Sequence, residues 1–144
     1  MTELIGVYVP QGNGNGNWTS DHRAVLYTFG IDSCVAVCAS NGAEAFMIHS
    51  DSMMDGGFGR IGLAVGLRNL IPSLGTGSGW NVVLIGGSSA QVAAHLTEHI
   101  PNATIYDYGY SDSAYITGSG VAAPSKRVLA ERLGVDSVNM ATPF

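Results

Sequence analysis

Two apolar runs, residues 34–39 (CVAVCA) and 43–49 (AEAFMIH), lie on either side of the dipeptide Asn41-Gly42. Asn-Gly is typical of the two-residue turn that joins antiparallel strands, because a type I′ turn needs a positive φ at both central positions. The flanking runs are rich in apolar side chains that suit a half-buried or buried strand. Together these features predict a β-hairpin, and therefore a fold that contains a sheet.

The predicted turn also determines which residues face each other across the hairpin. A two-residue loop places Cys34 directly opposite His49, with Cβ atoms about 4.5–5.5 Å apart on one face. Cysteine is a nucleophile in its thiolate form, and a neighbouring imidazole favours that form and takes the proton. The pair therefore indicates a cysteine-dependent catalytic site. The alternative is that Cys34 is an ordinary core thiol at the end of a strand.

The residues around Cys34 have distinct expected roles. Cys38 lies on the same predicted strand, four residues away, where the separation is roughly 13 Å. Bridged cysteines have Cα atoms within about 7 Å, so no disulfide is expected, and Cys38 is predicted to be a small buried hydrophobic residue. The segment 30–33 is tight, and the backbone N–H groups around Ser33 and Cys34 are candidates for an oxyanion hole.

The segment TFGIDSCVAVC, residues 28–38, resembles the T-L-G-x-G-S-C-V-A-V-C segment of the CheD chemotaxis family of protein-glutamine deamidases. Weaker similarity extends to VVLIGGSSA at 82–90, which resembles a later CheD strand that ends in Gly-Gly. In this resemblance, Thr28 matches the family's threonine and residues 33–34 match its Ser-Cys pair. The catalytic domains of cytotoxic necrotizing factors share the fold, and His49 falls where their spacing puts the histidine.

The resemblance implies a specific chemistry for the chain. Cys34 would be the nucleophile, His49 the base, and Thr28 the residue that orients the histidine, with no metal or cofactor. The reaction would be deamidation of a glutamine side chain on a protein substrate, such as a chemoreceptor or a GTPase-like signalling protein. The protein would act in the cytoplasm, or as an exported effector in a host cytosol. Two alternatives stay open: transglutamination, and a catalytically weak or inactive domain that binds a signalling protein.

The remaining pattern, together with the resemblance, predicts an α/β (α+β) fold in which a central β-sheet sandwich carries flanking helices. A chain of 144 residues favours one catalytic domain, residues 1–144. Ser125 is the expected N-cap of the last helix, and Gly134 is expected just past its end. Further strands are expected at 3–9, 23–29, 80–85, 103–108 and 112–117, and helices at 60–71, 89–100 and 125–133.

Charge and hydropathy restrict the kinds of partner. Hydrophobic residues make up 46% of the chain and charged residues 12%, and the formal net charge is −5. With one lysine and five arginines there is no basic stripe, so neither nucleic acid nor an anionic membrane surface is an expected partner. No run reaches the ~18 apolar residues of a membrane span, and the first residues lack a secretory leader pattern.

Three other motifs offer competing interpretations. HLTEH places His95 and His99 one helical turn apart, as zinc ligands require, but no third ligand is evident. GGSSA at 86–90 resembles the G-x-S-x-G turn of serine hydrolases, although a tight turn or a pocket lining near the cysteine is the preferred interpretation. YDYGY at 106–110 is a candidate substrate-facing aromatic edge.

Overall fold

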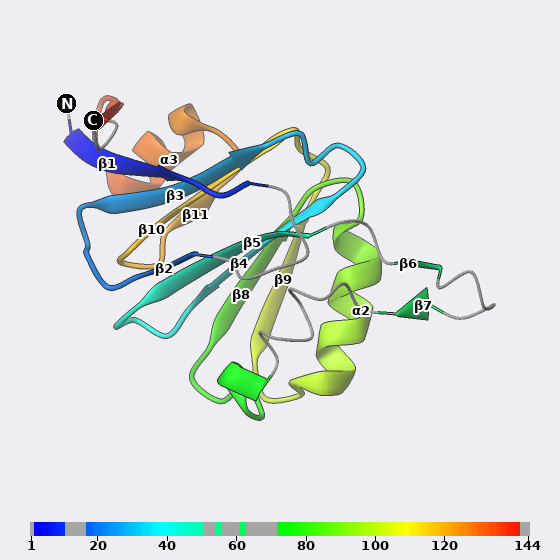
Figure 1. Cartoon of the computed structure of the whole chain (residues 1–144). Coiled ribbons are helices and arrows are strands. Elements are labelled where there is room, and N and C mark those ends of the chain that lie inside the picture. The colour runs from blue at the N-terminus through cyan, green and yellow to red at the C-terminus, as the bar shows by residue number, and fades with distance from the viewer. Residues whose placement is uncertain (1, 11–16, 51–53, 56–60, 63–71, 142–144) are drawn as a thin grey trace.

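The structure is a computed structural model, and it describes residues 2–10, 17–50, 54–55, 61–62 and 72–141. In this part of the chain two five-stranded sheets pack against each other, and a helix covers the outer face of each sheet (Figure 1). The layers therefore run helix, sheet, sheet, helix. The molecule is an α+β fold dominated by β-sheet, which agrees with the predicted α+β class and with the predicted sheet sandwich and flanking helices.

The first sheet is built mainly from the two ends of the chain. It contains β1 (Thr2–Tyr8), β3 (Ala24–Phe29), β10 (Ser113–Thr117), β11 (Ala122–Ala123) and β12 (Val138–Ala141), and helix α3 (Lys126–Leu133) covers it. The strand order is β11-β10-β3-β1-β12. Strand β1 is parallel to β3 and β12, whereas β10 is antiparallel to β3 and β11. The amino-terminal and carboxyl-terminal strands thus lie side by side (Figure 1).

The second sheet comes from the middle of the chain. It contains β2 (Asn17–Thr19), β4 (Val35–Ser40), β5 (Ala45–Ser50), β8 (Asn81–Ile85) and β9 (Thr104–Gly109), and helix α2 (Ser89–His99) covers it. The strand order is β2-β5-β4-β8-β9. Strands β8 and β9 are parallel, and α2 connects them across one face of the sheet. A separate two-stranded ribbon pairs β6 (Met54–Asp55) with β7 (Ile61–Gly62).

Apolar side chains fill three layers, one between the sheets and one beneath each helix. Strands β4 and β5 are buried at every position, because one face meets α2 and the other meets the first sheet. This double burial explains why their sequences are continuous apolar runs instead of alternating ones. Along β4, Val35 and Val37 face α2, whereas Ala36 and Cys38 face the first sheet.

The ends of helix α3 follow the sequence signals. In α3 the Ser125 Oγ accepts a hydrogen bond from the Val128 N–H at 3.2 Å. This bond satisfies one of the backbone N–H groups of the first turn that have no acceptor within the helix. Gly134 follows the helix with φ +73°, a left-handed conformation that glycine adopts without a steric cost. Both predicted ends of this helix are therefore confirmed.

The loop between β4 and β5 differs from the prediction. Ser40 pairs with Ala45, so the loop has four residues instead of two. Asn41 closes it with its side chain, since Oδ1 accepts hydrogen bonds from the backbone N–H groups of Ala43 at 3.0 Å and Glu44 at 2.9 Å. Among the described residues only glycines have positive φ, so the type I′ turn, which needs a positive φ at both Asn and Gly, is not formed.

The remaining strand predictions agree with the structure to within two residues. The helix expected at 60–71 is contradicted at residues 61–62, which form strand β7, and residues 60 and 63–71 lie outside the described part of the chain. Strands β2, β6, β11 and β12 were not predicted, and each has only two to four residues.

Candidate active site

Thr28 and His49 come from different sheets and meet in the space between them. Thr28 lies on β3 and is fully buried, and His49 lies on β5 with 3% of its surface exposed. The Thr28 Oγ1 lies 2.7 Å from the His49 Nδ1 and 2.7 Å from the carbonyl oxygen of Val9, just after β1. Two residues that the family resemblance assigned to one site are therefore in direct contact.

The contact with Val9 determines which nitrogen of the histidine carries hydrogen. A hydroxyl has one hydrogen and a backbone carbonyl can only accept, so Thr28 donates to the Val9 oxygen. The threonine oxygen is then the acceptor in its second contact, and the His49 Nδ1 donates to it. In a neutral imidazole with hydrogen on Nδ1, the basic lone pair is on Nε2. The ring is thus held in the tautomer that presents Nε2 as a base.

Cys34 lies immediately before β4 and is 8% exposed. It belongs to the apolar layer between the sheets, as do Ala36 and Cys38. Its side chain therefore lies on the same face of the second sheet as the His49 ring, which contacts Thr28 across that layer. Ala36 is the residue directly opposite His49, and Cys34 therefore lies two positions away, diagonal to the histidine. Diagonal neighbours have Cα atoms about 7–8 Å apart. The prediction of direct opposition is wrong, while the prediction of a shared face is correct.

The loop that carries Cys34 is seated on the turn between β8 and α2. The Gly87 N–H donates to the carbonyl of Ile31 at 2.9 Å, and the Ser88 N–H donates to the carbonyl of Cys34 at 3.0 Å. The Ser88 Oγ also donates to the carbonyl of Ser33 at 2.8 Å. Gly87 and Ser88 therefore bind three carbonyl oxygens of this loop.

The glycine pair in that turn allows a very close approach of the two backbones. A Cβ on Gly86 would lie 2.5 Å from the carbonyl oxygen of Cys34, and a Cβ on Gly87 would overlap the carbonyl oxygen of Asp32. Only glycine fits at such a contact. GGSSA is accordingly a turn that supports the cysteine loop, as the preferred interpretation of the sequence expected. The Ser88 hydroxyl donates its hydrogen to a carbonyl, which argues against Ser88 as a nucleophile.

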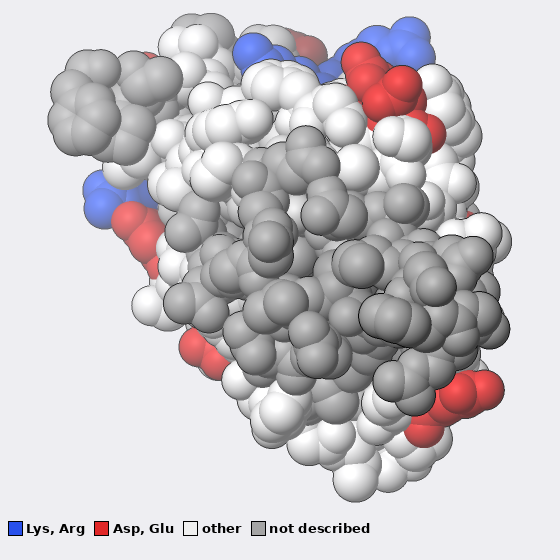
Figure 2. All heavy atoms as spheres, turned by 45° about the vertical axis from the view of Figure 1, so that its right-hand side comes forward, with Lys and Arg blue, Asp and Glu red and all other residues white. Residues whose placement is uncertain are grey.

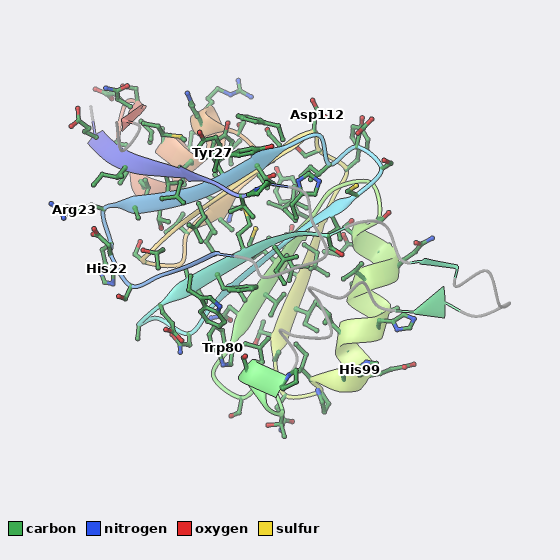
Figure 3. All side chains as sticks on the ribbon, viewed as in Figure 1. His22, Arg23, Tyr27, Trp80, His99 and Asp112 are labelled. Atoms are coloured by element: carbon green, nitrogen blue, oxygen red, sulfur yellow. The ribbon has the colours of Figure 1, made fainter. Side chains whose placement is uncertain are left out.

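The backbone N–H of Ser33 is one candidate oxyanion donor. Ser33 is exposed, and its N–H has no hydrogen-bond acceptor among the residues that the structure describes. The loop is tied to the first sheet at its start, where the Gly30 N–H donates to the carbonyl of Asp112 at 2.9 Å. Asp112 is at the end of the first sheet where β3 ends and β10 begins (Figure 3).

Cys38 behaves as the sequence predicts. Its thiol is free and fully buried in the layer between the sheets. Burial raises the pKa of this thiol to about 12, because the apolar surroundings disfavour the charged thiolate. Cys34 is likewise not part of a disulfide. Of the two cysteines, only Cys34 lies at the rim of the layer, next to a loop.

The remaining histidines lie away from this site. His22 is exposed on the turn before β3, and His99 is on helix α2, on opposite sides of the molecule (Figure 3). The rings of His95 and His99 stack with centroids 6.2 Å apart, and the His99 Nδ1 lies 2.9 Å from the His95 carbonyl oxygen. Within the described ranges no three His, Cys, Asp or Glu side chains could hold a metal ion together.

Charged side chains are scattered over the surface. On the face in Figure 2, Lys and Arg atoms lie near the margins, with Asp or Glu atoms beside them. An example is the exposed pair of Arg23 and Asp21, with nitrogen and oxygen 3.3 Å apart. The hydrogen bond from Arg23 holds the pKa of the Asp21 carboxyl below its ordinary value. None of the helices described is both long enough and apolar enough to cross a membrane.

Two contributors to the site were not predicted individually from the sequence. They are the carbonyl of Val9, which orients Thr28, and the side chain of Ser88, which binds the cysteine loop. The first acts through its main chain, for which no side-chain signal exists. The second was visible only as part of the Gly-Gly-Ser-Ser turn that resembles the later CheD strand.

No protein-family model matches the chain, and no curated protein matches it.

Proposed function

We propose that the chain is a cysteine-dependent deamidase of a protein glutamine side chain, with a CheD-like fold. The observation that carries the proposal is the hydrogen bond between Thr28 and His49, since it holds a buried imidazole in the tautomer that a general base requires. Cys34 lies on the same inter-sheet face, at the rim of the layer. A nucleophile, a base and a residue that orients the base are the parts that covalent amide hydrolysis needs.

In the first half of the proposed reaction, His49 Nε2 takes the Cys34 thiol proton, and the thiolate attacks the amide carbon of the glutamine. A carbon–sulfur bond forms, and the carbonyl oxygen becomes an oxyanion held by the backbone N–H groups around Ser33 and Cys34. The oxyanion then collapses, and the carbon–nitrogen bond breaks. The leaving nitrogen takes the proton from the His49 imidazolium and departs as ammonia, which leaves a thioester on Cys34.

In the second half, His49 takes a proton from water, and the resulting hydroxide attacks the thioester carbon. The carbon–sulfur bond breaks, the product is a glutamate side chain, and the proton returns from His49 to the Cys34 sulfur. If an amine replaces the water, the product is a substituted amide, which is transglutamination. The residues assigned here need no metal or cofactor for either outcome.

A second candidate function is binding to a signalling protein without turnover. The aromatic rings on the outer face of the first sheet favour it, because Tyr8 and Phe29 are 47% and 48% exposed. Their centroids are 6.2 Å apart, and each lies within 5.6 Å of the Tyr27 ring (Figure 3 labels Tyr27). Exposed aromatic clusters of this kind are typical of protein interaction surfaces.

The test uses two kinds of protein substrate, a chemoreceptor cytoplasmic domain and a Rho-type GTPase. Each is incubated with the protein, and released ammonia and the intact mass of the substrate are measured. A deamidase releases one ammonia for each glutamine converted, and the Cys34→Ser variant releases none. Binding of a substrate by both the wild type and Cys34→Ser, with no ammonia from either, would instead support the binding module.

A further inference from the structure

Ser88 occupies the N-cap position of helix α2, but its hydroxyl does not cap the helix. A serine at this position usually accepts a hydrogen bond from a backbone N–H of the first turn, which stabilises the helix by about 1 kcal/mol. In α2 no such side-chain bond forms. The hydroxyl instead donates to the carbonyl of Ser33, 55 residues earlier in the chain. Its contribution is therefore to the cysteine loop and not to the helix.

The position of that bond determines the direction of the next N–H. The carbonyl of Ser33 and the N–H of Cys34 belong to one planar trans peptide unit, so they point in opposite directions. Ser88 follows β8, which lies on one side of β4, and His49 is on β5, which lies on the other. A carbonyl directed toward Ser88 therefore directs the Cys34 N–H toward the side of β4 that carries the base.

A second bond from the same residue holds the next peptide unit, between Cys34 and Val35. The Ser88 N–H donates to the carbonyl of Cys34 at 3.0 Å, so the peptide bonds before and after the nucleophile are both held by Ser88. The hydroxyl bond at the Ser33 carbonyl also polarises the peptide unit that contains the Cys34 N–H, which strengthens this N–H as a donor. Both effects favour a donor that is preorganised for an anion.

We propose that the Ser88 hydroxyl positions the Cys34 N–H as the oxyanion-hole donor for acyl transfer by Cys34. Ser88 is a positioning residue, because it touches the peptide that binds the oxyanion and not the reacting atoms. The inference rests on the proposed function in one respect, namely that Cys34 attacks a carbonyl carbon. It goes beyond that function because it explains how the loop geometry is maintained.

Two reactions of the same thiol separate this role from a purely structural one. With 4-nitrophenyl acetate, the Cys34 thiolate attacks the ester carbon, an oxyanion forms, and 4-nitrophenolate leaves as the carbon–oxygen bond breaks. With iodoacetamide, the thiolate displaces iodide from a saturated carbon, and no oxyanion forms. The first reaction needs the oxyanion donor and the second does not. Both rates are measured on the same preparations, with peptide mapping to assign the modified cysteine.

Ser88→Ala should slow the acylation of Cys34 about tenfold and leave the alkylation rate unchanged. About tenfold is the lower end of the losses seen when a residue that positions an active-site group is removed. Ser88→Thr keeps a hydroxyl and should restore acylation. Ser89→Ala removes the neighbouring buried serine hydroxyl of the same helix and should change neither rate. Equal losses in both reactions, or no loss in acylation, would overturn the role of Ser88.

The same measurements distinguish this inference from the proposed function. A wild-type Cys34 that reacts with neither reagent would overturn both. Fast acylation of Cys34 that depends on Ser88, combined with no ammonia release from any glutamine-bearing protein, would contradict the deamidase proposal and leave the role of Ser88 supported.

Discussion

Replacing Thr28 with valine tests the link between the two sheets and the site. The substitution keeps the size and branching of the side chain and removes only its hydroxyl. That hydroxyl bonds both the carbonyl of Val9 and the Nδ1 of His49, each at 2.7 Å, in a position with no solvent exposure. The variant therefore takes away one donor and one acceptor from two buried partners.

The expected loss of stability follows from those partners. A buried polar group that loses its hydrogen bond costs about 1–3 kcal/mol, so two such groups cost about 2–6 kcal/mol together. Thr28→Ser is the matched control, because it keeps the hydroxyl and loses only a methyl group, at a cost of about 1 kcal/mol. Urea unfolding followed by circular dichroism measures both free energies.

The expected loss of reactivity follows from the histidine tautomer. Without the acceptor at Thr28, the His49 ring has no reason to keep its hydrogen on Nδ1, and alkylation of Cys34 by iodoacetamide should fall about 10–100-fold. Nitrogen NMR of labelled histidine reports the tautomer directly, and it should shift in Thr28→Val and not in Thr28→Ser. Equal unfolding free energies for the two variants, or an unchanged tautomer, would refute the assignment of Thr28 as the residue that orients the base.

Other consequences follow from the same geometry. At neutral pH iodoacetamide should alkylate Cys34 much faster than Cys38, because burial raises the pKa of the Cys38 thiol to about 12 and keeps it protonated. Equal alkylation rates of the two thiols, measured by peptide mapping, would mean that Cys34 is a structural cysteine. His49→Ala should slow the alkylation of Cys34, and an unchanged rate would remove His49 from the mechanism. Cys34→Ser should abolish ammonia release with an unchanged circular dichroism spectrum, whereas turnover at the wild-type rate would exclude a cysteine nucleophile. Gly87→Ala should lower the unfolding free energy by at least about 1–3 kcal/mol and perturb the cysteine loop, because the added methyl group would overlap the carbonyl of Asp32 in that loop. Gly42→Ala, which meets no atom within 4 Å but has φ +91°, is the control with backbone strain alone, and it should leave the reactivity of Cys34 intact.

The elements that were predictable carry their signal within a short stretch of sequence. Strand β8 is a continuous apolar run, and such runs occur where a strand is covered on both faces. Helix α3 has a serine at its start and a glycine past its end, each of which satisfies backbone groups locally. Neither prediction required knowledge of the neighbouring elements.

The strands that were missed depend on partners far away in the chain. Strand β12 pairs with β1, so its hydrogen bonds come from the opposite end of the sequence. Strand β11 has two residues and exists because β10 lies beside it. In short segments of this kind, tertiary pairing decides the conformation, and local propensity has little influence.

Although the predicted hairpin register is wrong, Cys34 and His49 still lie on the shared face that was predicted for them. Asn41 binds the loop backbone with its side chain, which lengthens the loop from two residues to four and moves the pairing of β4 and β5 by two positions. Side chains alternate between the faces of a strand with a period of two, so a shift of two preserves the face, whereas a shift of one would have reversed it. Cys34 and His49 therefore both remain on the side of the second sheet that meets Thr28. Their diagonal arrangement leaves the separation of sulfur and imidazole dependent on the cysteine loop before β4. The backbone N–H groups of Gly87 and Ser88 hold that loop at the carbonyls of Ile31 and Cys34.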